Sequence, residues 1–128
     1  MGEIIKLKCK NNDYEKNLQA GNGIMYATPE GIRSLFEDCQ ADEMNELKKD
    51  GYSFSARRRI CFDAEAKEYF SVVYCEMRKE DLVKKFIGRL PEGCTEVKVE
   101  ELQDPYEGCF ICPICNKKLT VTREGFWD

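Results

Sequence analysis

The sequence predicts a single α+β domain in which an antiparallel sheet is combined with two or three helices. Residues rich in Val, Ile, Tyr and Phe flank a short polar turn at positions 63–66, a pattern typical of a β-hairpin. Apolar residues also recur at helical spacing after Thr28-Pro29. No internal repeat or low-complexity linker divides residues 1–128, so we expect one core in one domain.

Five strands are expected, in chain order. Residues 3–9 alternate weakly between apolar and polar side chains and predict the first strand, which carries Cys9 to its end. Residues 53–62 and 68–75 form the two arms of the hairpin. Residues 95–102 alternate enough for a further strand, and residues 119–122 form the last one.

Three segments carry helix signals. Thr28 is a suitable cap and Pro29 fits a first helical turn, where its missing N–H costs nothing. The apolar side chains that follow at helical spacing are predicted core residues: Ile32, Leu35, Phe36 and Cys39. The acidic stretch 37–46 continues into a helix that ends at Asp50-Gly51, and residues 79–90 predict a short helix closed by Pro91.

The charge balance argues against partners that bind through a general positive field. Lys and Arg number 20 and Asp and Glu number 24, a net charge of −4, so tight binding to nucleic acid or to anionic lipid is not expected. Arg57-Arg58-Arg59 beside Tyr52 and Phe54 keeps a local phosphate contact open. The N-terminal residues lack the apolar core of a signal peptide and no run reaches membrane-spanning length, so we expect a cytoplasmic protein.

The chain contains eight cysteines and no histidine. Without a secretion signal, the cysteines are better interpreted as thiols and metal ligands than as a disulfide framework. The absence of histidine excludes Ser/His and Cys/His catalytic pairs and every mixed Cys/His metal site. Any zinc site is therefore built from cysteine, with Asp or Glu as the other available ligands.

The segment Cys112-Pro113-Ile114-Cys115-Asn116 has the spacing of a metal-binding turn. Two thiolates three positions apart can approach one tetrahedral ion at about 2.3 Å, while backbone N–H groups point at the sulfurs. Asn116 suits the turn because asparagine tolerates the left-handed conformation usually given to glycine. Cys112 and Cys115 are the first two predicted ligands.

The remaining ligands come from distant cysteines. Cys9 is the natural partner because it closes a long loop, although Asn12 stands where a second cysteine of its turn is expected. Cys75 ends an apolar strand and precedes a turn of similar length that lacks its second sulfur at Arg78. A buried strand thiol is the alternative interpretation of Cys75. The predicted ligand set is Cys9, Cys75, Cys112 and Cys115.

Cys109 offers a different ligand. With Cys112 and Cys115 it forms C-x-x-C-x-x-C, the spacing that holds three irons of a cubane cluster, and Cys9 is available as a fourth ligand. If residues 109–112 are extended, the odd separation turns the side chains of Cys109 and Cys112 to opposite faces. Cys61 and Cys94 have no partner spacing and are interpreted as core or surface thiols.

At these residues the chain resembles zinc-ribbon and rubredoxin-like proteins. Their Cys-x-x-Cys-Gly-Tyr and Cys-Pro-x-Cys-Gly knuckles are echoed by Cys9-Lys10-Asn11-Asn12-Asp13-Tyr14 and by Cys112-Pro113-Ile114-Cys115-Asn116. The chain also looks like a group of small, largely uncharacterised bacterial proteins with knuckles near both ends and after a middle strand. The resemblance implies zinc-ribbon-like knuckles joined to an antiparallel sheet.

A zinc ion held by four thiolates has no open coordination position, so the expected role is structural, in a non-catalytic binding or adaptor protein. Its partner is expected to be a protein or, with weaker support, a nucleic acid; no small-molecule substrate is indicated. The alternative is a rubredoxin-like iron centre or an iron–sulfur cluster that transfers electrons, because iron and zinc occupy similar thiolate sites. Elemental analysis and an absorption spectrum distinguish the two.

Overall fold

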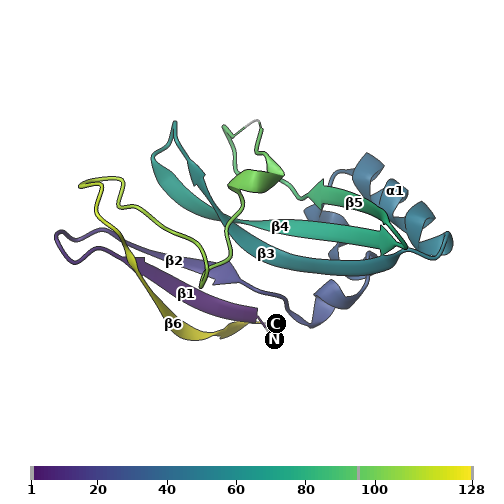
Figure 1. Cartoon of the computed structure of the whole chain (residues 1–128), viewed down its shortest axis with the longest axis horizontal. Helices are drawn as coiled ribbons and strands as arrows, with labels where there is room; N and C mark the ends of the chain where they lie inside the picture. The colour runs from purple at the N-terminus through teal and green to yellow at the C-terminus, as the bar shows by residue number, and fades with distance from the viewer. Residues whose placement is uncertain (1, 95, 128) are drawn as a thin grey trace.

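Two three-stranded antiparallel sheets and a small number of helical segments make up an α+β fold (Figure 1). The computed structural model describes residues 2–94 and 96–127. The first sheet has the order β2-β1-β6 and consists of β1 (Gly2–Lys8), β2 (Glu15–Ala20) and β6 (Thr120–Trp127). The second has the order β3-β4-β5 and consists of β3 (Ser53–Asp63), β4 (Glu68–Lys79) and β5 (Leu82–Ile87).

The first sheet joins the two ends of the chain. β1 lies between β2 and β6, with Gly2 opposite Trp127 and Lys8 opposite Thr120. The sequence predicts β1 and the start of β6 but not β2, in which only Leu18 and Ala20 are buried. Both termini lie at one end of this sheet, and the loops after β1 and before β6 lie at the other (Figure 1).

The hairpin of β3 and β4 is confirmed. Its turn is held by Asp63, whose Oδ1 accepts hydrogen bonds from the backbone N–H groups of Glu65 and Ala66. Asp63 pairs with Glu68 where the two strands meet. The turn chemistry and the β-branched and aromatic arms therefore indicate the same structure.

The helix predicted over residues 79–90 is wrong. Lys79 pairs with Leu82 across a two-residue turn in which Glu80 has a φ of 54°, and the chain returns as β5. Leu82 is exposed, whereas Phe86 enters the core opposite Cys75. Phe86 is buried and Ile87 is partly buried, whereas Leu82 and Val83 are exposed, so the apolar spacing that suggested a helix does not correspond to one buried face.

One α-helix, α1 (Asp38–Lys49), is present among the described residues, and it confirms the helix predicted to end at Asp50-Gly51. Glu37 and Gln40 form a capping box at its start, and Gly51 has a φ of 93° just after its end. Cys39 lies exposed in the first turn of α1, which corrects its assignment to the core. No helix among the described residues is long and apolar enough to cross a membrane.

The other helical segments are short 3-10 turns. η1 (Ile24–Ala27) and η2 (Glu30–Leu35) replace the helix predicted from Thr28, and η2 is kinked at Ile32. The strand predicted over 95–102 is also wrong, since η3 (Val99–Glu101) lies there; its first residue, Thr95, is outside the described residues. These segments instead pack single apolar side chains against the sheets.

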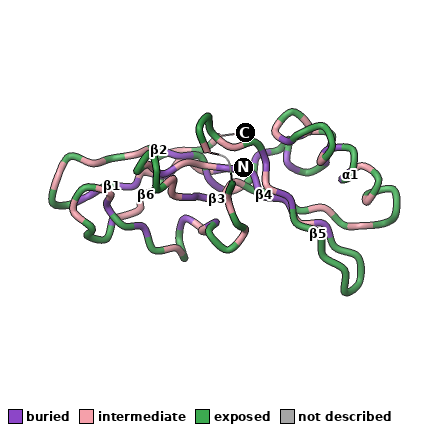
Figure 2. Tube along the Cα trace, turned by 90° about the horizontal axis from the view of Figure 1, so that it is seen from above, coloured by how far each residue is buried: buried purple, intermediate pink, exposed green. Residues whose placement is uncertain are grey.

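The core follows the strands, and the turns at either end of the molecule are exposed (Figure 2). One cluster joins the first sheet to the hairpin end of β3 and β4 through Ile5, Leu7, Ile60 and Tyr69. A second cluster packs α1, η1 and η2 against β4 and β5, and it contains Phe36, Met44, Cys75 and Phe86. The two ends of the chain are thus tied to one sheet while α1 packs on the other.

Candidate metal centre

Strand pairing brings Cys9 and the pair Cys112 and Cys115 to the same place. Cys9 directly follows β1, and Cys112 and Cys115 lie in the turn that precedes β6. Because β1 and β6 are antiparallel, with Lys8 opposite Thr120, the end of β1 meets the start of β6. The structure therefore brings these three of the four predicted ligands to one place.

The three sulfur atoms converge. The Sγ atoms of Cys9, Cys112 and Cys115 all lie within 4.8 Å of one another, and those of Cys9 and Cys115 are 3.5 Å apart. Two thiolates on a tetrahedral zinc ion lie about 3.8 Å apart when each Zn–S bond is about 2.3 Å. The spacing fits one metal ion with little movement. Cys9 and Cys112 are buried, and Cys115 is partly exposed.

Each buried sulfur accepts a hydrogen bond from the backbone of its own turn. The N–H of Asn11 donates to Cys9 Sγ and the N–H of Ile114 donates to Cys112 Sγ, both at 3.4 Å. Asn116 closes the second turn with a φ of 62° and donates its N–H to the carbonyl oxygen of Cys112 at 3.0 Å. Such N–H donors stabilise the thiolate form, which is the form that binds metal.

Asn12 lies beside the sulfurs. Its Nδ2 is 3.5 Å from Cys112 Sγ and donates to it, and its Oδ1 accepts a hydrogen bond from the Tyr14 N–H at 2.8 Å. The sequence predicts that a cysteine is missing at this position, and the structure places the asparagine side chain against the cluster. Its side-chain amide adds a third N–H donor to the two backbone donors of the cluster.

The surroundings separate the pKa values of two neighbouring thiols. Burial alone raises the pKa of Cys112, but hydrogen bonds from Asn12 and from the N–H groups of Cys115 and Ile114 outweigh it and lower the pKa to about 6. For Cys9, the Asn11 N–H lowers the pKa, but burial and the adjacent sulfurs outweigh it and raise the pKa. The hydrogen bonds to Cys112 Sγ therefore favour its thiolate form more than those to Cys9 Sγ favour that of Cys9.

Tyr69 in β4 holds the segment that leads into the Cys112 turn. Its hydroxyl donates to the carbonyl oxygen of Ile111 at 2.8 Å and accepts from the Ile111 N–H at 2.7 Å. The ring is buried and packs edge-on against Phe110, with centroids 5.6 Å apart. The second sheet therefore positions the turn on the first. The sequence offered no signal for this role, because Tyr69 reads as an ordinary strand aromatic.

Cys75 is not brought to the cluster, which corrects the predicted set of four ligands. It lies fully buried in β4, opposite Ala56 and Phe86, and packs in the core beneath α1. Burial, with a smaller effect of Glu76, raises the pKa of its thiol to about 12. The buried strand thiol is the interpretation that the structure supports. Cys75 shares its face of β4 with Tyr69 but lies farther along the strand, where α1 instead of the first sheet covers that face.

Cys109 also lies outside the cluster. Cys109 and Ile111 are exposed while Phe110 and Cys112 are buried, the alternation of an extended segment. The N–H of Cys109 donates to Gln103 Oε1 at 2.8 Å, and the alternation turns the side chains of Cys109 and Cys112 to opposite faces of the segment. The geometric argument from the odd separation therefore holds.

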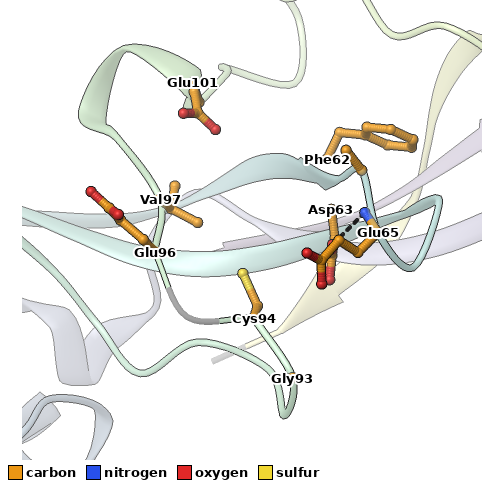
Figure 3. A pocket seen from close by; sticks show the side chains of 9 residues that line it. Phe62, Asp63, Glu65, Gly93, Cys94, Glu96, Val97 and Glu101 are labelled. Carbon is orange, nitrogen blue, oxygen red and sulfur yellow. Dashed lines mark hydrogen bonds between the residues drawn. The ribbon is translucent and has the colours of Figure 1, made fainter.

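A hollow of about 220 Å³ lies apart from the cysteine cluster, beside the turn between β3 and β4 (Figure 3). It is lined by Asp63, Glu65, Glu96 and Glu101 together with Cys94. Asp63 and Glu65 lie together in that turn, whereas Glu96 and Glu101 lie apart from them on another segment (Figure 3). Among the described residues, Cys9, Cys112 and Cys115 are the one group of three or more Cys, Asp or Glu side chains whose ligand atoms lie within 4.8 Å.

The arginine run is divided by the alternation of β3. Arg58 points inward, where its Nε donates to the Tyr26 hydroxyl at 2.9 Å. Arg57 and Arg59 lie on the opposite face, and the guanidinium of Arg59 stacks over Tyr74 at 5.4 Å from the ring centroid. The three arginines therefore do not form a single basic patch.

Comparisons of this chain with protein-family models, with curated proteins and with solved structures find no match.

Proposed function

We propose that this protein binds one zinc ion through Cys9, Cys112 and Cys115 and that the ion holds the two ends of the chain together. The observation that supports the proposal is the convergence of three sulfurs from turns 106 positions apart in the chain. Zinc prefers thiolates in tetrahedral geometry, and the sulfur spacing suits that preference. The ion acts as a crosslink in a zinc-ribbon-like arrangement of two facing turns.

A crosslink at this place stabilises the fold because it closes a loop that spans most of the chain. Closing that loop costs the unfolded chain conformational entropy. A metal that binds only the folded form offsets this cost, because its binding free energy adds to the free energy of folding. The metal is therefore structural, and the function of the whole protein is that of a binding or adaptor protein for another macromolecule.

Iron is the second candidate, because three or four thiolates also hold a mononuclear iron. The cubane-cluster interpretation has less support, since Cys109 faces away from Cys112 and Cys115. Purified protein that is red or brown and contains iron would favour the electron-transfer alternative over zinc.

The test measures bound metal in full-length protein purified under reducing, anaerobic conditions. We expect about one zinc per chain in the wild type, since three thiolates form one site. Cys112→Ser should lose most of that zinc and unfold at a lower temperature. Cys39→Ser is the matched control, because Cys39 is exposed and far from the cluster, and it should keep its zinc.

Two outcomes contradict the proposal. One is wild-type protein that takes up neither zinc nor iron when either is supplied with all cysteines reduced. The other is equal metal content in Cys112→Ser and Cys39→Ser, which would show that the cluster does not hold the ion.

A further inference from the structure

The cysteine cluster supplies three sulfurs for an ion that takes four ligands. No fourth Cys, Asp or Glu among the described residues has a ligand atom within 4.8 Å of the three sulfurs. Cys109 faces away from the cluster and Cys75 lies in the core under α1. The side chain that does lie against the sulfurs is Asn12.

The orientation and hydrogen bonds of the Asn12 side chain make it a poor fourth ligand for the metal. Its Nδ2 donates to Cys112 Sγ, so the group directed at the cluster is an N–H donor without a lone pair for a metal. Its Oδ1 accepts the Tyr14 N–H at 2.8 Å and lies 3.9 Å from Cys112 Sγ, and a neutral amide oxygen is a hard ligand among soft thiolates. Asn12 therefore stabilises the thiolates without completing the coordination.

We propose that the bound ion keeps one exchangeable coordination position on its Asn12 side, and that this position takes a small thiol. The inference rests on the proposed zinc function of the same cluster. It differs from a closed structural site, because a three-thiolate zinc ion holds water until a better ligand replaces it. A small cellular thiol could then coordinate the protein-bound ion directly.

Access and charge both suit a small anionic ligand. Cys115 and Asn12 are partly exposed, whereas Cys9 and Cys112 are buried, so the open position faces the exposed side. Lys10 follows Cys9, and Lys117 and Lys118 follow Cys115; all three are exposed. Zinc with three thiolates carries a charge of −1 and a fourth thiolate makes it −2, which these lysines partly offset.

The exchange involves no oxidation. The thiol loses its proton to the solvent, the new Zn–S bond forms, and the bound water leaves with its hydrogens. The zinc ion and the three cysteines keep their oxidation states throughout.

The test uses cobalt in place of zinc, because cobalt occupies the same thiolate sites and its sulfur-to-metal charge-transfer absorption grows with the number of bound thiolates. Full-length protein loaded with one equivalent of Co²⁺ is titrated with 2-mercaptoethanol. We expect the charge-transfer band of the wild type to rise saturably by about one third, from three bound sulfurs to four.

Two variants make the result specific to the fourth position. Asn12→Cys supplies a fourth thiolate, so it should show the higher absorption without added thiol and should not respond to the titration. Asn12→Ser is the matched control, because it removes the amide without adding a ligand of that kind, and it should respond as the wild type does.

The outcomes separate this inference from the proposed function. A wild-type spectrum that already equals that of Asn12→Cys and ignores added thiol overturns the exchangeable position and leaves metal binding intact. Failure of the wild type to bind either Co²⁺ or zinc overturns both proposals.

Discussion

At the level of single residues, the cysteines differ in what surrounds each sulfur. Cys9 and Cys112 accept hydrogen bonds from backbone N–H groups, a setting that stabilises thiolates. Cys75 and Cys61 lie among apolar side chains, where burial raises the pKa of their thiols to about 12 and about 11. The C-x-x-C spacing of Cys112 and Cys115 predicts a metal-binding turn from the sequence. A single strand cysteine has no such spacing, so the sequence does not show whether it packs in the core or binds metal.

The structure predicts that Cys75→Ala keeps its zinc and loses roughly 1–2 kcal/mol of unfolding free energy, because a buried sulfur is removed from the core. The pKa of Cys75 is raised from 9.0 to about 12, so its stabilising effect is present below about pH 9 and is lost as the pH rises toward 12. The wild type should therefore lose more stability than the variant on going from pH 8 to pH 10.

Denaturant unfolding at the two pH values and zinc content by elemental analysis are the measurements. Cys39→Ala, at an exposed position, is the control and should change neither. Loss of zinc from Cys75→Ala alone would return Cys75 to the ligand set and contradict the assignment made here.

At the level of elements, Tyr69 connects the two sheets at the cluster. Its hydroxyl bonds both backbone groups of Ile111, one residue before Cys112. Tyr69→Phe keeps the ring packing and removes both hydrogen bonds, so we expect a loss of about 1–3 kcal/mol of unfolding free energy. Weaker zinc binding should accompany that loss, because the Cys112 turn is then less well held.

Zinc titration against a chromophoric chelator, together with thermal unfolding, measures both effects. Tyr106→Phe is the comparison, since Tyr106 is exposed and bonds only the side chain of Glu3 and its own loop among the described residues. Equal zinc affinity in the two variants would show that Tyr69 supports the fold without positioning the turn.

A glycine substitution in the turn between β4 and β5 changes the unfolding free energy in opposite directions for a hairpin and for a helix. Glu80 has a φ of 54°, a conformation that costs a non-glycine residue about 1 kcal/mol. Glu80→Gly should therefore raise the unfolding free energy by about 0.5–1 kcal/mol. In the helix that the sequence predicts over residues 79–90, the same change would lower it by about 1 kcal/mol. Urea unfolding decides between them.

At the level of the whole molecule, charge and strand direction limit the contact with nucleic acid. The net charge is −4, and Arg58 is directed inward, away from Arg57 and Arg59. We expect weak or no binding to random-sequence DNA or RNA at physiological salt, since few phosphates can be neutralised at once. Fluorescence anisotropy with a labelled oligonucleotide measures this. A submicromolar complex that resists added salt would contradict it.

Some elements were predictable because the local signals agree with one another. The hairpin of β3 and β4 has aromatic and β-branched arms around an Asp63 turn, and α1 has a capping box at its start and Gly51 after its end. β5 was predicted as a helix because Leu82, Val83, Phe86 and Ile87 match helical spacing as well as strand pairing. β2 was missed because it is mostly polar and depends on β1 for its hydrogen bonds.

The sequence by itself determined that Cys112 and Cys115 lie close together in one turn, because that depends on local geometry; for Cys109 it left two orientations open until the extended backbone of residues 109–112 was known. Only the tertiary structure decided which distant residues join that turn. Cys9 and Asn12 reach it because β1 pairs with β6, and Cys75 does not because it lies farther along β4, in the part of the sheet that α1 covers. Ligands that are distant in the chain meet through sheet pairing, and local spacing carries no information about that pairing.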